Sequence, residues 1–134
     1  MSDQNVIVVA GNEEAAEAAL RFGVYFCQNE RSFRPSKFIA FYKSQGITNV
    51  FEILEEPEDH IKSENLSHLA DYNKAYPENI SKNRKMFKLK KVESITLKIE
   101  NDAEDKRQDA ILNQRYTTLS SLVLAKSMSD ISWL

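Results

Sequence analysis

The chain contains little cysteine, glycine or proline for its length. Its 134 residues include one cysteine, three glycines and three prolines. Cys27 therefore has no partner for an intrachain disulfide, and no cysteine cluster is present to hold zinc. Because the glycines are scattered, the sequence has no glycine-rich loop for binding phosphate. We expect Cys27 to pack as a small buried hydrophobe on a strand.

The chain also lacks a long hydrophobic run. The apolar residues 6–10 follow a polar start and are too few for a secretory signal peptide. No segment approaches the ~20 apolar residues of a membrane span. The sequence therefore predicts a cytoplasmic, bacterial protein with no membrane contact. Its length and its 42% hydrophobic content indicate one globular domain over residues 1–134.

The charge is small overall but unevenly distributed. A formal net charge of −2 predicts no broad attraction to nucleic acid. Residues 52–64 form an acidic stretch with six acids and one lysine, whereas residues 82–91 form a basic stretch with no acid. The acids are Glu52, Glu55, Glu56, Glu58, Asp59 and Glu64, and the bases are Lys82, Arg84, Lys85, Lys88, Lys90 and Lys91.

The hydrophobic pattern predicts a sheet with few helices. Gly11 and Asn12 break the first strand and Gly23 ends the first helix, while Thr118 caps the last helix. A four-residue turn, 43–46, is expected between the third and fourth strands, and residues 101–109 form a charged loop. The predicted strands are 6–10, 24–27, 38–42, 47–54, 86–92 and 95–99, and the predicted helices are 13–22 and a final one from residue 119.

A polar excursion at residues 56–80 interrupts this pattern. Within it, 60–76 has weak helical spacing and is predicted as a helix or an ordered loop. The order of elements indicates an α+β fold, with a mixed sheet curled into a partial barrel and two to three peripheral helices.

Three stretches form a recognisable pattern when they are taken in order. They are residues 6–10 with the following helix and 23–26; residues 37–44 with 46–53; and residues 114–119 with Leu122, 125–127 and Asp130. Together they resemble a PUA-like, EVE-like domain of bacterial defence- and restriction-associated proteins. The resemblance covers nearly the whole chain except the polar excursion. Val24 and Asn49 stand where that pattern commonly has an aromatic residue and a histidine.

The resemblance implies a five- to six-stranded pseudo-barrel with a concave pocket. Relatives in the wider PUA-like group bind RNA or read a modified base that is flipped into the pocket. Such a pocket needs aromatic walls for stacking and a few polar groups for the base edge. The residues in the matched segments that suit this role are Tyr25, Phe41, Tyr42, Thr48, Asn49, Arg115, Tyr116 and Thr117.

Each of these residues also has a plain structural interpretation. The aromatic side chains pack equally well in a core, and a tyrosine often lies at a pocket edge because its hydroxyl needs a polar partner. Arg115 suits either a phosphate or a structural carboxylate. Lys85, Lys88 and Lys90 are candidate phosphate contacts, or else a solvated edge that resists aggregation.

The sequence gives no support for a catalytic centre, a metal or a cofactor. His60, Glu64 and His68 share a face only if residues 60–70 are helical, which makes a metal site a weak alternative. No catalytic residue is assigned, and the chain is more typical of a binding module than of an enzyme.

Three functions remain open at this stage. The main hypothesis is a module that binds nucleic acid or a modified nucleotide. The second is a protein-interaction or regulatory subunit, which would use the acidic stretch 52–64 or the apolar Ile131, Trp133 and Leu134. The third is a small enzyme acting on nucleotides or RNA, with Arg115 and Glu52 or a metal at His60.

Overall fold

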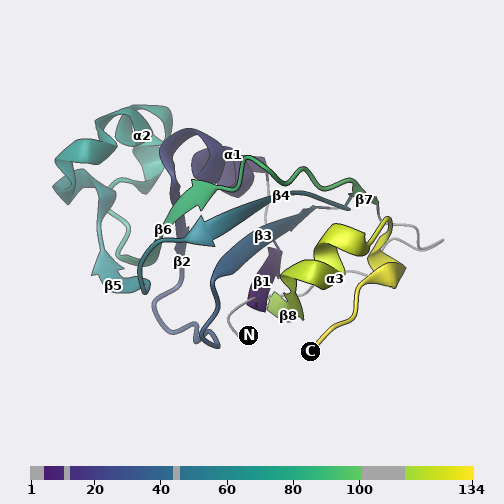
Figure 1. Ribbon diagram of the computed structural model, residues 1–134. Helices are drawn as coiled ribbons and strands as arrows, with labels where there is room; N and C mark the ends of the chain where they lie inside the picture. The colour runs from purple at the N-terminus through teal and green to yellow at the C-terminus, as the bar shows by residue number, and fades with distance from the viewer. Residues whose placement is uncertain (1–4, 11–12, 44–45, 101–113) are drawn as a thin grey trace.

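The computed structural model describes residues 5–10, 13–43, 46–100 and 114–134 (Figure 1). Within these residues the chain has an α+β fold, with a mixed sheet and three short α-helices. The strands are β1 Asn5–Ala10, β2 Val24–Cys27, β3 Phe38–Lys43, β4 Gly46–Ile53, β5 Glu58–Ile61, β6 Arg84–Lys91, β7 Ile99–Glu100 and β8 Gln114–Thr118. The helices are α1 Glu13–Phe22, α2 Ala70–Ala75 and α3 Leu119–Leu124.

The strands form one open sheet in the order β2-β6-β4-β3-β1-β8. Two short strands lie off this path, since β5 pairs with β6 and β7 pairs with β4. β1 and β3 are parallel, whereas the other paired strands are antiparallel. Among the described residues β2 and β8 end the path and do not pair with each other, so the sheet is not closed. The prediction of an α+β fold with a mixed sheet and two to three helices is confirmed.

Strand β1, which lies between β3 and β8, is buried on both of its faces. Val6 and Val8 face a core cluster that includes Leu122 of α3, whereas Ile7 and Val9 face a second cluster that includes Ala19 of α1. Helices α1 and α3 therefore cover opposite faces of the sheet (Figure 1). A strand that is covered twice needs apolar side chains at every position, which explains its continuous β-branched sequence.

Helix α1 ends as the sequence predicts. The Gly23 amide donates to the Ala19 carbonyl at 3.1 Å, and Gly23 has a φ of 69°, in the left-handed region that favours glycine. A Cβ on Gly23 would lie 2.9 Å from the Leu89 carbonyl oxygen. The turn therefore lets β2 pair directly with β6.

The polar excursion is more irregular than a single helix. It consists of β5, short 3-10 turns and the six-residue α2. Its apolar residues Leu69, Tyr72 and Tyr76 pack against Ala18 of α1 and Val24 of β2, in a third cluster. The weak helical spacing of 60–76 thus marks a segment that covers the outer side of α1 and β2.

Three boundaries differ from the prediction. The β3–β4 hairpin leaves only residues 44–45 between its strands instead of four. The expected strand 95–99 reduces to β7, because Leu97 donates to the Thr48 carbonyl outside a regular ladder. Residues 114–118 form a strand, β8, that the sequence pattern did not predict. The predicted charged loop 101–109 lies outside the described residues.

The predicted cap of the final helix is confirmed. Thr118 is in an extended conformation, and its hydroxyl accepts a hydrogen bond from the Ser121 amide at 3.2 Å. In the described part of the chain no helix combines the length and the apolar character needed to cross a membrane.

Candidate functional site

The predicted pocket residues lie on two opposite faces of the sheet. Tyr25, Phe41 and Tyr116 belong to the core cluster under α1, whereas Tyr42 belongs to the cluster under α3. Side chains of neighbouring strand residues alternate between faces, so Phe41 and Tyr42 cannot line one cavity. Thr117 faces the α3 side, where its hydroxyl donates to the Ser132 carbonyl at 2.7 Å.

The three aromatic residues under α1 are largely core residues. Phe41 is 4% exposed, and its ring lies 5.2 Å from that of Tyr25 and 5.6 Å from that of Phe51, in edge-to-face contacts. Tyr25 and Tyr116 are also buried, but both hydroxyls have polar partners. Tyr25 alone of the three also lines a sizeable cavity.

The remaining polar candidates lie apart from that cavity. The Arg115 guanidinium covers the Trp133 ring at 4.2 Å, on the α3 side. Thr48 and Asn49 hydrogen-bond to each other at 3.2 Å and border a void of only ≈ 10 Å³ beside Phe41. That void is too small for any ligand larger than a water molecule.

The basic strand β6 is paired with the acidic stretch. Lys85 contacts Asp59 at 2.7 Å, and Lys88 lies 3.3 Å from Glu55 and 3.8 Å from Glu58. β5 carries Glu58 and Asp59 and pairs with β6, while Glu55 lies shortly before β5 in the chain. Lys90 is exposed and has no ion-pair partner among the described residues. Two of the three candidate phosphate contacts are therefore already neutralised by carboxylates.

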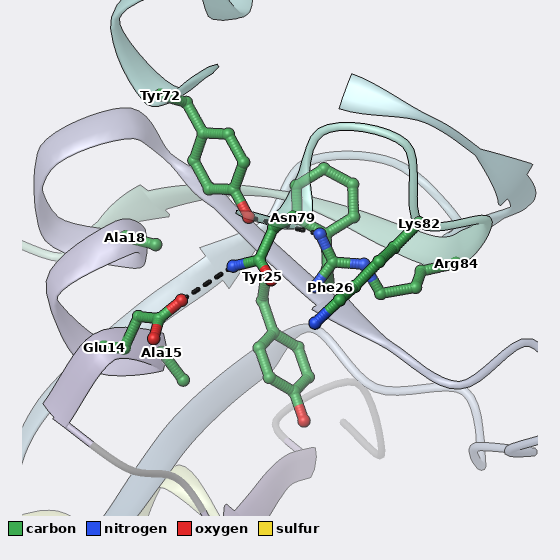
Figure 2. Close-up of a pocket in the computed structure, with 9 residues that line it drawn as sticks. All are labelled: Glu14, Ala15, Ala18, Tyr25, Phe26, Tyr72, Asn79, Lys82 and Arg84. Carbon is green, nitrogen blue, oxygen red and sulfur yellow. Dashed lines mark hydrogen bonds between the residues drawn. The ribbon is translucent and has the colours of Figure 1, made fainter. Parts of the chain in front are cut away.

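Two adjoining cavities lie between α1, β2 and the start of β6. Their volumes are ≈ 270 Å³ and ≈ 450 Å³. Both are lined by Ala15, Tyr25, Phe26, Lys82 and Arg84, which form their shared wall. Figure 2 shows the smaller one, which we call the inner cavity. We call the larger one the outer cavity.

Arg84 is held in the inner cavity by an aromatic ring and a hydroxyl. Its guanidinium lies 4.4 Å from the centre of the Phe26 ring and donates to the Tyr72 hydroxyl at 3.3 Å (Figure 2). Its Nε atom is buried and has no hydrogen-bond partner. A guanidinium carries five N–H donors in a fixed fork, which suits an anionic partner in the two cavities that Arg84 lines.

A carboxylate and an amide complete the inner cavity. The Asn79 amide nitrogen donates to Glu14 Oε1 at 2.8 Å, which joins the first turn of α1 to the 3-10 turn Pro77–Asn79 (Figure 2). Asn79 is 6% exposed. The pair presents hydrogen-bonding groups to whatever occupies the cavity.

Arg31 lines the outer cavity. Its guanidinium donates to the Tyr25 hydroxyl at 3.0 Å and to Gln114 Oε1 at 2.7 Å and 3.2 Å. Burial raises the pKa of the Tyr25 hydroxyl, and the Arg31 charge opposes that effect. Burial also raises the pKa of the Cys27 thiol to about 11, so this cavity residue is not a ready nucleophile.

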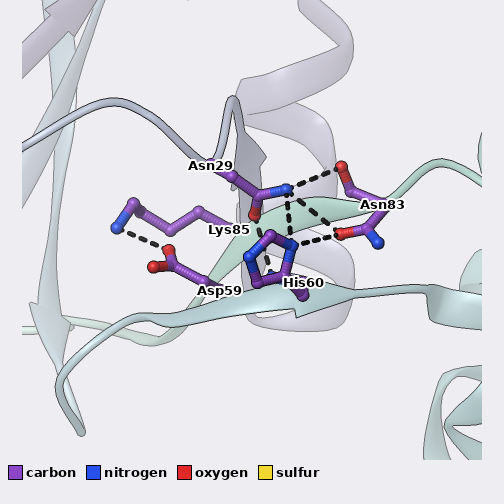
Figure 3. A network of polar contacts seen from close by, with 5 residues as sticks. All are labelled: Asn29, Asp59, His60, Asn83 and Lys85. Carbon is purple, nitrogen blue, oxygen red and sulfur yellow. Dashed lines mark hydrogen bonds and ion pairs between the residues drawn. The ribbon is translucent and has the colours of Figure 1, made fainter.

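The segment that carries Lys82 and Arg84 is fixed by a polar network at Asn83. The Asn29 amide nitrogen donates to the Asn83 carbonyl at 3.2 Å and to its side-chain oxygen at 3.1 Å (Figure 3). The His60 amide donates to the Asn29 side-chain oxygen at 2.8 Å. His60 has a φ of 60°, a strained conformation outside glycine, which this network supports.

His60 does not take part in a metal centre with Glu64 and His68. His60 lies on β5, whereas the other two lie in separate 3-10 turns, so the helical spacing that joined them does not apply. No group of three or more metal-ligating side chains occurs in the part of the chain that the structure describes.

A third cavity of ≈ 480 Å³ is lined in part by Lys85 and Phe87 of β6 and has a different chemistry. Two carboxylates, Glu55 and Glu56, stand there against two cations, Arg34 and Lys85, and Lys85 already contacts Asp59. The paired cavities at Tyr25 have three cations and, among the described residues, the single carboxylate Glu14. They therefore form the better candidate site for an anionic ligand.

Sequence reasoning found Tyr25 but missed Phe26, Arg31, Lys82 and Arg84 as members of one site. Lys82 and Arg84 begin the basic stretch, which was a usable signal. No sequence signal marked Phe26 or Arg31 as site residues, because their positions in the site depend on how β2 pairs with β6. Comparison with protein-family models, curated proteins and solved structures yields no match to this chain.

Proposed function

We propose that this protein is a binding module for nucleotides or nucleic acid, and that the paired cavities at Tyr25 hold the ligand. One observation carries the proposal. Lys82 and Arg84 line both cavities together with the aromatic Tyr25 and Phe26, and Arg31 lines the outer one. Cationic side chains suit phosphate, and aromatic faces suit a base.

The local charge supports binding of an anion. Glu14 is the only carboxylate that lines either cavity within the described residues. Lys82 is exposed and has no ion-pair partner there, unlike Lys85 and Lys88 of β6. A guanidinium offers several fixed donors, so Arg84 can still bind phosphate while it contacts Tyr72.

The proposal includes the PUA-like, EVE-like architecture that the sequence resembles. The mixed sheet and the helix between β1 and β2 support it. Arg31 adds to this support, since it connects Tyr25 on β2 with Gln114 on β8 across the open side of the sheet. We propose the same setting, a cytoplasmic protein of a bacterial defence system.

A ligand-induced shift in stability tests the function. Wild-type protein is heated with nucleosides, nucleotides, modified bases and short oligonucleotides. A ligand present at 100 times its dissociation constant should stabilise the fold by about 2.7 kcal/mol. Lys82→Ala should reduce the shift, whereas Lys98→Ala, which removes an exposed lysine outside the cavities, should keep it. The proposal fails if no compound shifts the midpoint, or if both variants respond like the wild type.

A second candidate function rests on an apolar surface near the C-terminal part of the chain. Val123, Leu124 and Leu134 are 52%, 80% and 59% exposed. Scattered exposed apolar residues are common, whereas a group of them often contacts a protein partner. Light scattering and a pull-down from the native host with Leu124→Ser as the control would test this role. A monomer that captures the same proteins as Leu124→Ser would rule it out.

A further inference from the structure

We infer that the ligand is a single nucleoside monophosphate and not a polynucleotide chain. This inference rests on the proposed function, and it concerns the same paired cavities. The volumes of ≈ 270 Å³ and ≈ 450 Å³ together fall within the range of sites that hold one small molecule. The residues that line the two cavities differ in chemistry, so each cavity suits a different end of the ligand.

The outer cavity suits the phosphate. Arg31, Lys82 and Arg84 all line it, and no carboxylate does so among the described residues. Lys82 is exposed and has no ion-pair partner in the described part of the chain. A phosphomonoester carries up to two negative charges, which these cations would balance.

The inner cavity suits the base. Tyr25, Phe26 and Tyr72 line it, while Glu14 and Asn79 supply hydrogen-bonding groups. The Glu14 carboxylate only accepts hydrogen bonds, so it favours a base edge that carries N–H donors. It also repels a phosphate, and it thereby fixes the ligand with its phosphate in the outer cavity.

The charges around the paired cavities disfavour a polynucleotide ligand. A polynucleotide needs further cations along its path, because each phosphate brings another charge. The lysines nearest to the site on β6 are instead paired, Lys85 with Asp59 and Lys88 with Glu55. The protein as a whole carries a formal charge of −2.

Isothermal titration calorimetry on the full chain tests the inference. The probes are the common 5′-monophosphates, the matching nucleosides, and hexanucleotides with and without a 5′-phosphate. We expect a monophosphate to bind at least tenfold more tightly than its nucleoside and than either hexanucleotide. Lys82→Ala should remove most of the advantage over the nucleoside, whereas Lys98→Ala, at an exposed lysine outside the cavities, should keep it. Glu14→Gln should change the ranking of the bases while the phosphate advantage remains.

The outcomes separate this inference from the proposed function. Hexanucleotides that bind as tightly as the monophosphate, with the same loss in Lys82→Ala, would overturn the single-nucleotide assignment and leave the proposed function standing. A monophosphate that binds no better than its nucleoside would also overturn the assignment. If no probe binds at all, both the assignment and the proposed function are wrong.

Discussion

The Arg31 guanidinium donates two hydrogen bonds to the Gln114 side-chain oxygen, of 2.7 Å and 3.2 Å. Gln114 lies on β8, whereas Arg31 follows β2, so the contact joins the two ends of the strand order. Gln114 in turn contacts Tyr116: the Gln114 side-chain nitrogen donates a hydrogen bond to the Tyr116 hydroxyl at 2.9 Å. An open sheet thus gains a polar bridge where it lacks a backbone ladder.

Removing this bridge should lower stability. Arg31→Met leaves Gln114 and Tyr25 without their partly buried donor, which should lower the free energy of unfolding by about 1–3 kcal/mol. Urea unfolding measures the change. Arg21→Met, which removes an exposed arginine with a 3.5 Å pair to Glu17, should change it by less than about 1 kcal/mol. Equal losses in the two variants would show that the bridge adds nothing.

Gly46 should not tolerate a side chain. Its φ of 131° is one that other residues rarely adopt, and a Cβ would lie 1.7 Å from the Ile99 carbonyl oxygen. Gly46→Ala should therefore separate β4 from β7 and cost more stability than Gly23→Ala, whose Cβ would meet the Leu89 oxygen at 2.9 Å. Thermal unfolding of both variants ranks them. The reverse order would contradict the close approach at Gly46.

Neutralising the acids beside β6 should create binding to polyanions. Glu55→Gln, Glu58→Gln and Asp59→Asn together release Lys85 and Lys88. The triple variant should bind single-stranded nucleic acid with an affinity that falls as salt rises. Fluorescence anisotropy at several salt concentrations measures it.

A matched triple variant controls for net charge. Glu64→Gln, Asp71→Asn and Glu78→Gln remove the same number of exposed carboxylates from the polar excursion, away from the β6 ion pairs. This variant should stay close to the wild type. If both triple variants gain the same affinity, overall charge explains the effect and the local ion pairs do not.

The Cys27 thiol should react slowly in the folded protein. Burial raises its pKa to about 11, so only about one thiol in a thousand is ionised at pH 8. A colourimetric thiol reagent at pH 8 should label it far more slowly without urea than with urea. Fast labelling of the native protein would contradict the burial.

The same thiol predicts how stability depends on alkaline pH. The folded state holds the Cys27 proton more tightly than the unfolded state, because desolvation raises its pKa. This contribution is therefore complete below the ordinary thiol pKa and is lost as pH rises through about 11. Urea unfolding of wild type and Cys27→Ala across this range isolates it. Parallel curves for the two proteins would refute it.

Much of the fold follows from local sequence. The β-branched run 6–10 predicts a doubly covered strand, and Gly23 and Thr118 predict the ends of two helices. β8 escaped prediction because its residues, Gln114–Thr118, show little apolar alternation. Residues 114–118 become a strand because they pair with β1, which is distant from them in the sequence.

The candidate site was less predictable than the fold. Strand alternation implies that Phe41 and Tyr42 face opposite ways, but only the covering helices decide which face keeps a cavity. The pairing of Lys85 with Asp59 depends on the β5–β6 register. Arg31 and Arg84 meet Tyr25 only after the sheet has formed. Such properties arise from contacts between distant segments, which a single sequence does not encode locally.

The pairing of β1 with β8 also sets an order of events during synthesis. β1 leaves the ribosome well before Gln114–Thr118, so a nascent chain carries one edge of this apolar strand unpaired until β8 has been made. Unpaired apolar edges are where growing chains associate with one another. The nascent protein therefore has its greatest need for chaperone protection before β8 has emerged, and a ribosome stalled short of that point would hold a chain that is prone to aggregate.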